Sequence, residues 1–147
     1  MRLVVQRTDG VKLRIDGKIH SSTDRGLLVL LGTKTGDTEQ ACHKLAEKVV
    51  NLRIFEDDQG KMNLSALDVG AEIMIVSQFT LYADTKKGRR PAFTDAMEPV
   101  EAERLYERFV DMVKSHNLNV GTGVFGAKMD LSFNNCGPVT IILEHET

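Results

Sequence analysis

Apolar and polar residues alternate near both ends of the chain with the period of two that is typical of β-strands with one buried face. The alternation is clear at residues 11–15 and 129–133. Shorter apolar or β-branched segments lie beside them, at residues 3–7 and 139–143. We therefore expect the chain to begin and end in β-structure.

Two further segments also indicate strands, and the first of them is an apolar run that is too short for a helix. Residues 27–31 are all apolar and are followed by Gly32, which is typical of a strand that is buried on both faces in the centre of a sheet. Residues 73–79 also have a strand-like pattern. Residues 27–31 therefore predict a central strand, and residues 73–79 predict a further strand.

Two longer segments show the spacing of three to four residues that indicates an amphipathic helix. In the first, Asp37 offers an N-cap oxygen and Gln40 follows three residues later, which resembles a capping box. In the second, Pro99 suits the first turn of a helix, and we expect Asn117 to end it. The apolar stripes that follow these two start signals are Cys42, Leu45, Ala46, Val49 and Leu52, and then Leu105, Phe109, Met112 and Val113.

Strands outnumber long helices in this pattern, which predicts an α+β fold with an antiparallel or mixed sheet. The chain has 147 residues, 41% of them hydrophobic, and a formal net charge of −2, which suits one domain with its own core. We expect a single domain over residues 1–147. No apolar segment approaches the roughly 20 residues that cross a bilayer, and the first residues lack a signal-peptide pattern.

Cysteine usage and charge limit the compartment and the partners. The two cysteines, Cys42 and Cys136, provide no disulfide framework, so we expect a reducing compartment, the cytoplasm. Because the chain is slightly acidic, any RNA contact must come from a local basic surface. The segment 86–90 is such a surface, although a basic loop of this length is usually only solvated. Its basic residues are Lys86, Lys87, Arg89 and Arg90.

Several further motifs favour ordinary structural interpretations. Residues 121–126 match the letters of a dinucleotide-binding fingerprint, but they follow a helix and precede a strand, which favours a glycine-rich entry into a strand or a bulge. The acidic residues 56–58 precede a turn sequence, which favours a solvated hairpin tip over a carboxylate active site. Cys42 and His43 diverge on a helix, and the histidines lack ligand spacing, so the residues give no support for a metal site.

Two motifs resemble those of the D-aminoacyl-tRNA deacylase family, SQFTLYAD at residues 77–84 and NCGPVT at residues 135–140. Other segments similar to that family follow one another in the family's order. They lie at residues 4–7, 26–32, 44–48, 51–55, 61–65 and 87–91. Because the resemblance runs nearly from end to end, the chain is identified as a member of that family.

The resemblance implies hydrolysis of the ester that joins a D-amino acid to the 3′-terminal adenosine of tRNA, and removal of glycine from mischarged tRNA. It also implies a β-rich, barrel-like sheet with two main helices packed outside, a homodimer, and no metal or organic cofactor. The expected partner is the aminoacylated 3′ end of tRNA. We expect neither DNA nor a membrane as a partner.

The resemblance assigns a catalytic role to the segment that contains Ser77, Gln78, Phe79 and Thr80. The backbone N–H groups of Phe79 and Thr80 are the candidate oxyanion donors. Gln78 and Met62 would line the pocket for the terminal adenosine, and the basic loop would contact phosphates. Each of these roles is implied by the family and not by the residue types alone.

Gly137 and Pro138 are implied to select chirality. Only about 5 to 6% of X-Pro bonds are cis, so the residues alone predict a trans bond, whereas the resemblance implies a cis bond. In the cis form the two carbonyl groups would make a wall that an L side chain meets and a D side chain or glycine avoids. This loop would reach into the partner subunit's pocket, with Arg7 as a support.

Some alternatives stay open at this point. Cys136 and Lys128 depart from the family pattern, because acidic residues are common at both positions. Thr80 is an alternative nucleophile, but the sequence places no His or Lys to activate it, which favours water assisted by the substrate's ribose 2′-hydroxyl. A non-catalytic protein that binds the tRNA end, or a hydrolase of small esters or peptides, would also fit part of the pattern.

Overall fold

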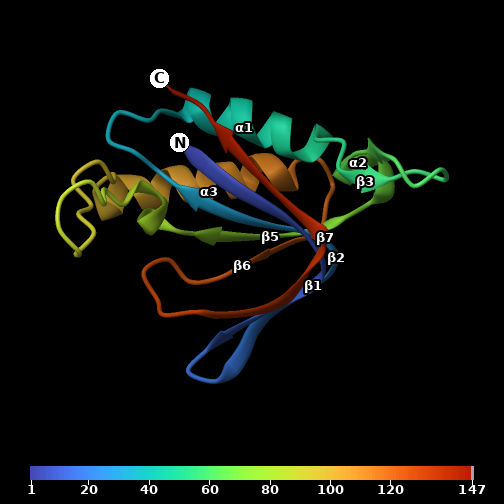
Figure 1. Cartoon of the computed structure of the whole chain (residues 1–147), viewed down its shortest axis with the longest axis horizontal. Coiled ribbons are helices and arrows are strands. Elements are labelled where there is room, and N and C mark those ends of the chain that lie inside the picture. Colours follow the sequence, from blue (N-terminus) through green and yellow to red (C-terminus); the bar gives the residue numbers. More distant parts are fainter. Residues whose placement is uncertain (147) are drawn as a thin grey trace.

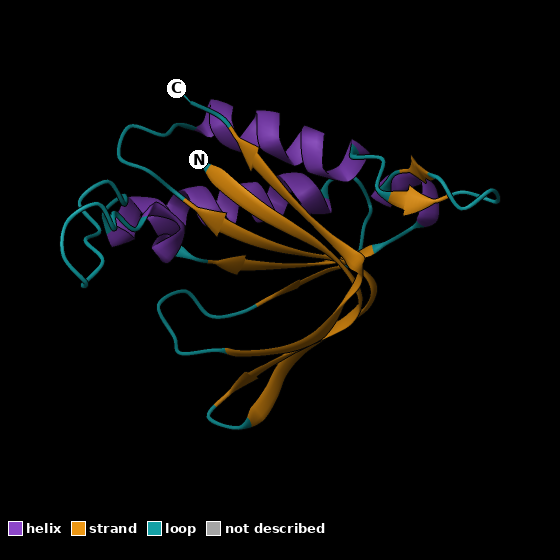
Figure 2. Ribbon diagram, in the orientation of Figure 1, coloured by secondary structure: helices purple, strands orange, loops and turns teal. Residues whose placement is uncertain are grey.

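A curved five-stranded sheet with α1 and α3 on one face, and a separate two-stranded sheet, make up this computed structural model, which describes residues 1–146 (Figures 1 and 2). The strands are β1 (Arg2–Ile15), β2 (Lys18–Gly32), β3 (Phe55–Glu56), β4 (Met62–Leu64), β5 (Glu72–Ser77), β6 (Val120–Thr122) and β7 (Asp130–Glu144). The helices are α1 (Glu39–Asn51), α2 (Ala66–Val69), the 3-10 helix η1 (Phe79–Tyr82) and α3 (Pro99–Lys114).

The main sheet has the strand order β6-β5-β2-β1-β7 and is mixed. β1 pairs antiparallel with β2 and β7, whereas β5 runs parallel to both β2 and β6. The central position of β2 confirms the prediction for residues 27–31, and the α+β class is confirmed as well. The curved sheet stays open, because β6 and β7 end the strand order and do not pair with each other in residues 1–146 (Figure 2).

The separate segments that we predicted near each end of the chain belong to single long strands. Residues 3–7 and 11–15 both lie in β1, which continues through Gly10 at a φ of +136°. A Cβ at this position would lie 2.8 Å from the carbonyl oxygen of Thr23, so glycine allows the close approach of β2. The segments 129–133 and 139–143 likewise lie in or beside β7.

The sheet buries apolar side chains on both of its faces. On one face, α1 and α3 pack over a large cluster that includes Leu3, Leu45 and Phe109. On the opposite face a second cluster forms, composed of Val11, Leu13, Leu28, Met74 and Val76. Partly exposed apolar residues, among them Leu131 and Phe133, pack against that second cluster. The figures show no helix over this second face (Figure 2).

The second predicted helix is confirmed as α3, with Pro99 in its first turn. Its buried stripe includes Leu105, Phe109 and Val113, as the spacing predicted. The helix ends at Lys114, and Asn117 follows in a left-handed conformation with a φ of 61°. The end therefore comes slightly earlier than the sequence suggested.

The first predicted helix is confirmed as α1, but the predicted capping box is wrong. Thr38 is the N-cap residue, and its side chain makes no capping hydrogen bond. The Asp37 carboxylate instead accepts hydrogen bonds from the Met1 ammonium group and the Lys34 amide, each at 2.7 Å. A buried cation is a stronger partner for a carboxylate than a helix amide.

The acidic segment 56–58 lies at the tip of the β3–β4 hairpin, as predicted. The Asp57 carboxylate accepts hydrogen bonds from the amides of Gln59 and Lys61, at 2.9 and 3.0 Å, which closes the turn. These amides hold the pKa of Asp57 below its usual value. In residues 1–146 no helix is long and apolar enough to span a membrane, and no group of three His, Cys, Asp or Glu side chains suits a metal ion.

Candidate functional site

A mostly apolar cavity of about 470 Å³ opens where β5 ends. Its walls come from the end of β5, from η1, from the start of α3 and from the loop before β7. Among the lining residues are Ser77, Gln78, Phe79, Met97, Phe125, Gly126 and Met129. Three of the four residues predicted to form the catalytic segment therefore line one cavity.

β5 ends at Ser77, two residues before the predicted end, and the chain then turns into η1. The Gln78 amide donates to the Leu31 carbonyl oxygen at 2.7 Å, which ties the start of the turn to β2. The first amides of a helix have no partner inside it, and the Phe79 and Thr80 amides find no other acceptor among residues 1–146. These two N–H groups are therefore available to an oxygen atom of a ligand.

The hydroxyl groups beside these amides have no base to activate them. The Thr80 hydroxyl accepts a hydrogen bond from the Gln78 side-chain amide. Within the described part of the chain, no carboxylate, imidazole or amine makes a hydrogen bond with the Ser77 or Thr80 hydroxyl. An unactivated hydroxyl is a weak nucleophile, so the geometry disfavours covalent catalysis by either residue.

Gly137 and Pro138 lie within β7, where its pairing with β1 is irregular, and this bulged segment, the Gly137–Pro138 loop, is held by Arg7. The Arg7 guanidinium donates to the carbonyl oxygens of Cys136 at 3.0 Å and Ile54 at 2.8 Å. The Gly137–Pro138 peptide bond is cis, and Gly137 has a φ of +131°. A Cβ on Gly137 would lie 2.9 Å from Arg7 Nη2, so this position is restricted to glycine by both conformation and space.

The register of the sheet separates this loop from the cavity. Gly137 lies level with Arg7, which pairs with Leu27, and Leu27 pairs with Ile73, four residues before Ser77. With the usual strand dimensions, four residues along β5 and three strand spacings across the sheet put the two motifs about 19 Å apart. A single chain therefore does not bring both motifs to one ester bond.

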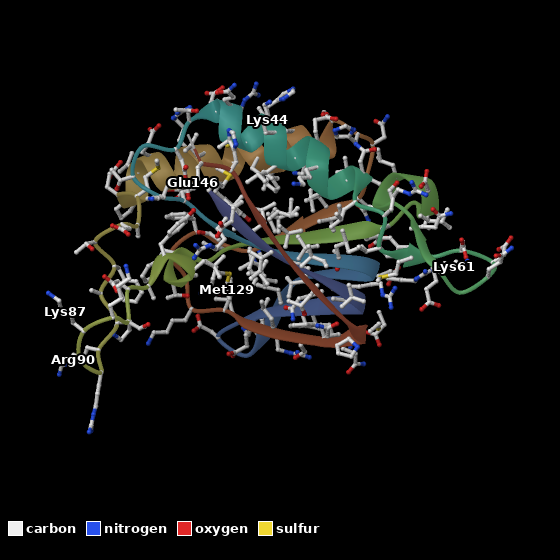
Figure 3. All side chains as sticks on the ribbon, turned by 45° about the horizontal axis from the view of Figure 1, so that its top comes forward. Lys44, Lys61, Lys87, Arg90, Met129 and Glu146 are labelled. Carbon is white, nitrogen blue, oxygen red and sulfur yellow. The ribbon has the colours of Figure 1, made fainter. Side chains whose placement is uncertain are left out.

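The other predicted site residues lie at opposite ends of the molecule. Lys86, Lys87, Arg89 and Arg90 are exposed in a loop that is closed by two backbone hydrogen bonds between Asp84 and Ala92. Phe93 follows this loop and packs its ring edge against Phe79, with 5.0 Å between the centroids. Figure 3 shows Lys87 and Arg90 reaching outward from this loop. The basic loop is thus joined to η1.

Met62 lies far from the basic loop, on the β3–β4 hairpin, and its side chain is 57% exposed. Figure 3 shows the neighbouring Lys61 at the end of the molecule opposite to Lys87. Met62 does not line the cavity beside Ser77. Within one chain, the structure therefore does not bring Met62 and Gln78 together.

The sequence reasoning missed one wall of the cavity, the segment that contains Phe125 and Gly126. The signal is the glycine-rich segment 121–126, for which the sequence alone favours only an entry into a strand or a bulge. A Cβ on Gly123 would lie 2.3 Å from the Met129 sulfur atom, so glycine lets this segment pack closely on the residues before β7. The segment begins within β6 and opens no helix, so it is not a dinucleotide turn.

Comparison with known proteins assigns the family. The family model described as D-Tyr-tRNA(Tyr) deacylase matches residues 4–144. The chain belongs to the D-aminoacyl-tRNA deacylase family. A D-aminoacyl-tRNA deacylase of Aquifex aeolicus is 54% identical over 144 residues, which cover 98% of this chain and 97% of the relative. One of Thermosipho africanus is 51% identical over the same coverage.

Two solved structures share the fold of this family member. One, described as a c-Myc DNA Unwinding Element Binding Protein, has a TM-score of 0.93 and 38% identity, and the match covers 100% of both chains. Another, described as a probable eukaryotic D-amino acid tRNA deacylase, has a TM-score of 0.85 and 20% identity, and the match covers 97% of both chains. Our expectation that this deacylase-family chain binds no DNA stays a prediction.

Proposed function

We propose that the protein hydrolyses the ester between a D-amino acid, or glycine, and the 3′-terminal adenosine of tRNA. The observation that carries this proposal is the pair of unpartnered amides on Phe79 and Thr80 beside an apolar cavity. The family membership of residues 4–144 supplies the substrate class. Two neighbouring backbone donors without an acceptor suit the oxygen of a tetrahedral intermediate.

The chemistry rests on backbone groups and on the substrate. Water attacks the ester carbonyl carbon, and the negative charge that develops on its oxygen is held by the Phe79 and Thr80 amides. In comparable sites one such donor contributes about 2.7 to 4 kcal/mol. The bond to the ribose 3′-oxygen then breaks, and the water's proton passes through the adjacent 2′-hydroxyl to that departing oxygen.

The cavity and the basic loop would bind the RNA end. The cavity of about 470 Å³ is large enough for one nucleoside, and Gln78 offers a side-chain amide at the edge of this cavity. The loop with Lys86, Lys87, Arg89 and Arg90 would contact phosphates, because its link to Phe79 through Phe93 keeps it beside the site. We propose that this chain meets aminoacyl-tRNA in the cytoplasm. We also propose that DNA is not one of its partners.

Chirality would be selected by the loop of a second copy of the chain. The separation of about 19 Å between Gly137 and Ser77 in one chain supports a dimer in which each loop completes the partner's site. The backbone carbonyls of Gly137 and Pro138 would then face the substrate's α-carbon. In such a dimer an exposed Met62 could also approach the adenosine of the partner's site.

The second face of the sheet is the surface that this dimer would bury. Its central residues, such as Met74 and Val76, are buried, whereas Leu131 and Phe133 beside them are only half covered. Leu131 also lines the cavity, so this apolar surface is continuous with the site. A partner packed here would reach the cavity and exclude water from it.

The direct test is a turnover assay with D-tyrosyl-tRNA, L-tyrosyl-tRNA and D-tyrosine methyl ester, measuring free tyrosine. We expect fast release from the D-tRNA alone. Binding of both tRNAs without any release would identify a non-catalytic tRNA-end-binding protein. Release from the methyl ester at the rate of the D-tRNA would identify a hydrolase of small esters. Either result would refute the proposed function.

A further inference from the structure

Three strand ends meet in one row beneath η1. Arg2 on β1 is paired with Gly32 at the end of β2 on one side and with Glu144 at the end of β7 on the other. η1 carries the candidate oxyanion amides and lies against the β2 end of this row, where Gln78 is hydrogen-bonded to Leu31. These three paired residues, Arg2, Gly32 and Glu144, therefore form the surface that η1 packs against, which we call the platform.

The Arg2 side chain binds the last part of η1 in two ways. Its Nη1 donates to the Leu81 carbonyl oxygen at 2.6 Å, and its guanidinium carbon lies 4.9 Å from the centre of the Tyr82 ring. Its Nε donates to the Glu144 carboxylate, which fixes the plane of the guanidinium. A charged donor makes a shorter and stronger hydrogen bond than a neutral one, and a guanidinium also stacks well on an aromatic ring.

Gly32 lets η1 lie close to β2. A Cβ on Gly32 would lie 3.0 Å from the Leu81 Cβ and 3.1 Å from the Gln78 carbonyl oxygen, so a side chain would push η1 away from β2. The turn itself is a single 3-10 turn of four residues, with few hydrogen bonds of its own. Its orientation therefore depends on contacts to the platform below it.

We propose that Arg2 is a positioning residue for the reaction, which holds η1 so that the Phe79 and Thr80 amides meet the oxyanion. The role rests on the function proposed above for those two amides. Oxyanion donors act over a narrow range of distance, so a small tilt of the turn weakens transition-state binding more than substrate binding. Arg2 does not line the cavity, and its guanidinium binds Glu144, Leu81 and Tyr82, none of which is assigned to the chemistry.

The test compares kcat and KM for D-tyrosyl-tRNA in Arg2→Gln, Arg2→Lys and Arg14→Gln. Arg14 lies on the same strand, where its guanidinium donates to the Ser132 hydroxyl on an exposed surface, so Arg14→Gln is a matched control. We expect Arg2→Gln to lower kcat about tenfold with KM changed less than about twofold, the pattern of a lost transition-state interaction. Arg2→Lys keeps the charge but not the planar fork, so it should recover only part of kcat. Arg14→Gln should keep both constants.

A second variant approaches η1 from the other side. Gly32→Ala leaves Arg2 intact but places a methyl group against Leu81, and we expect the same selective loss of kcat. Circular dichroism must show folded protein for each variant. A normal kcat in folded Arg2→Gln would overturn the proposal, as would loss of folding in both Arg2→Gln and Gly32→Ala, which would make the row a general stability element. Failure of the unmodified protein on D-tyrosyl-tRNA would refute the proposed function instead.

Discussion

Arg7 holds the backbone carbonyl oxygen of Cys136 at 3.0 Å, between residues that are 129 positions apart in the sequence. The same guanidinium binds the Ile54 carbonyl oxygen, so it joins β1, the part of β7 just before Gly137 and the segment before β3. The Cys136 side chain takes no part in this contact. Its Sγ lies 3.6 Å from the Asn134 carbonyl oxygen instead. A cysteine therefore fits at this position without any change in the support of the loop.

Gly137→Ala should lower turnover of D-tyrosyl-tRNA at least about tenfold, because tenfold needs only about 1.4 kcal/mol and the added Cβ must displace Arg7 or the loop. That Cβ would lie 2.9 Å from both Arg7 Nη2 and the Val139 side chain, at a φ that L residues rarely adopt. Cys136→Ala is the matched control and should keep normal turnover and normal rejection of L-tyrosyl-tRNA. Unchanged kinetics in Gly137→Ala would mean that the loop is only a turn.

Phe133→Asp should produce an inactive monomer. Phe133 packs on the apolar cluster of the second sheet face, which we propose to be the dimer interface, so a charge there would have to be buried. Ser132→Asp changes the neighbouring residue on the opposite side of the strand and should remain dimeric and active. Sedimentation velocity measures the mass of each variant in solution, which is compared with the chain mass of 16.3 kDa. A fully active monomer of the unmodified protein would exclude a shared site.

Stability should fall above about pH 9 in part through Cys42. Burial, together with the negative charges of Glu39 and Asp37, raises the pKa of the Cys42 thiol from 9.0 to about 11. The unfolded chain therefore loses this proton before the folded chain does, so the thiol's contribution to stability is lost as the pH rises from 9 toward 11.

Urea denaturation of the unmodified protein and Cys42→Ala, at matched concentrations and at pH 8 and 10.5, measures this contribution. Between these two pH values the free energy of unfolding should fall more in the unmodified protein than in Cys42→Ala. The difference between the two slopes should be at most about 1.4 kcal/mol per pH unit. The tyrosines titrate in both proteins and cancel in the comparison. Equal losses in the two proteins would contradict the assignment to Cys42.

Local signals predicted the parts of the fold that local chemistry determines. The stripe of α3 and its start at Pro99 follow from helical spacing, and the hairpin tip at Asp57 follows from turn composition. The capping role predicted for Asp37 is wrong because one of its partners, the Met1 ammonium group, lies 36 residues away in the sequence. No pattern within a short window contains that information.

The site was predicted only as far as the family motifs reach. Residues 73–79 have a strand-like pattern, yet the strand stops at Ser77, because the following turn packs on Gly32 and binds Arg2. Such contacts join distant segments, so periodicity does not reveal them. The cavity wall at Phe125 was missed for the same reason: its glycine-rich segment is shaped by packing against Met129.

The last prediction decides which hydroxyl group takes part in the chemistry. Ser77→Ala and Thr80→Ala should each keep activity within about tenfold, since loss of a nucleophile would cost far more than the 1.4 kcal/mol that tenfold represents. The Thr80 hydroxyl accepts a hydrogen bond from the Gln78 side chain and makes none with a base, so removal of this hydroxyl should have little effect on the reaction. Single-turnover rates with D-tyrosyl-tRNA measure both variants.

The matching change is made in the RNA. A tRNA charged through its 3′-oxygen but lacking the terminal 2′-hydroxyl should bind with normal affinity, because the phosphates and the adenine face remain. Its ester should be hydrolysed slowly, because no neighbouring hydroxyl carries the proton from the attacking water to the departing oxygen. Filter binding and single-turnover rates separate the two effects. If the deoxy substrate reacts at the normal rate while Thr80→Ala is inactive, then the protein hydroxyl is the nucleophile, and the two amides would serve a covalent intermediate instead.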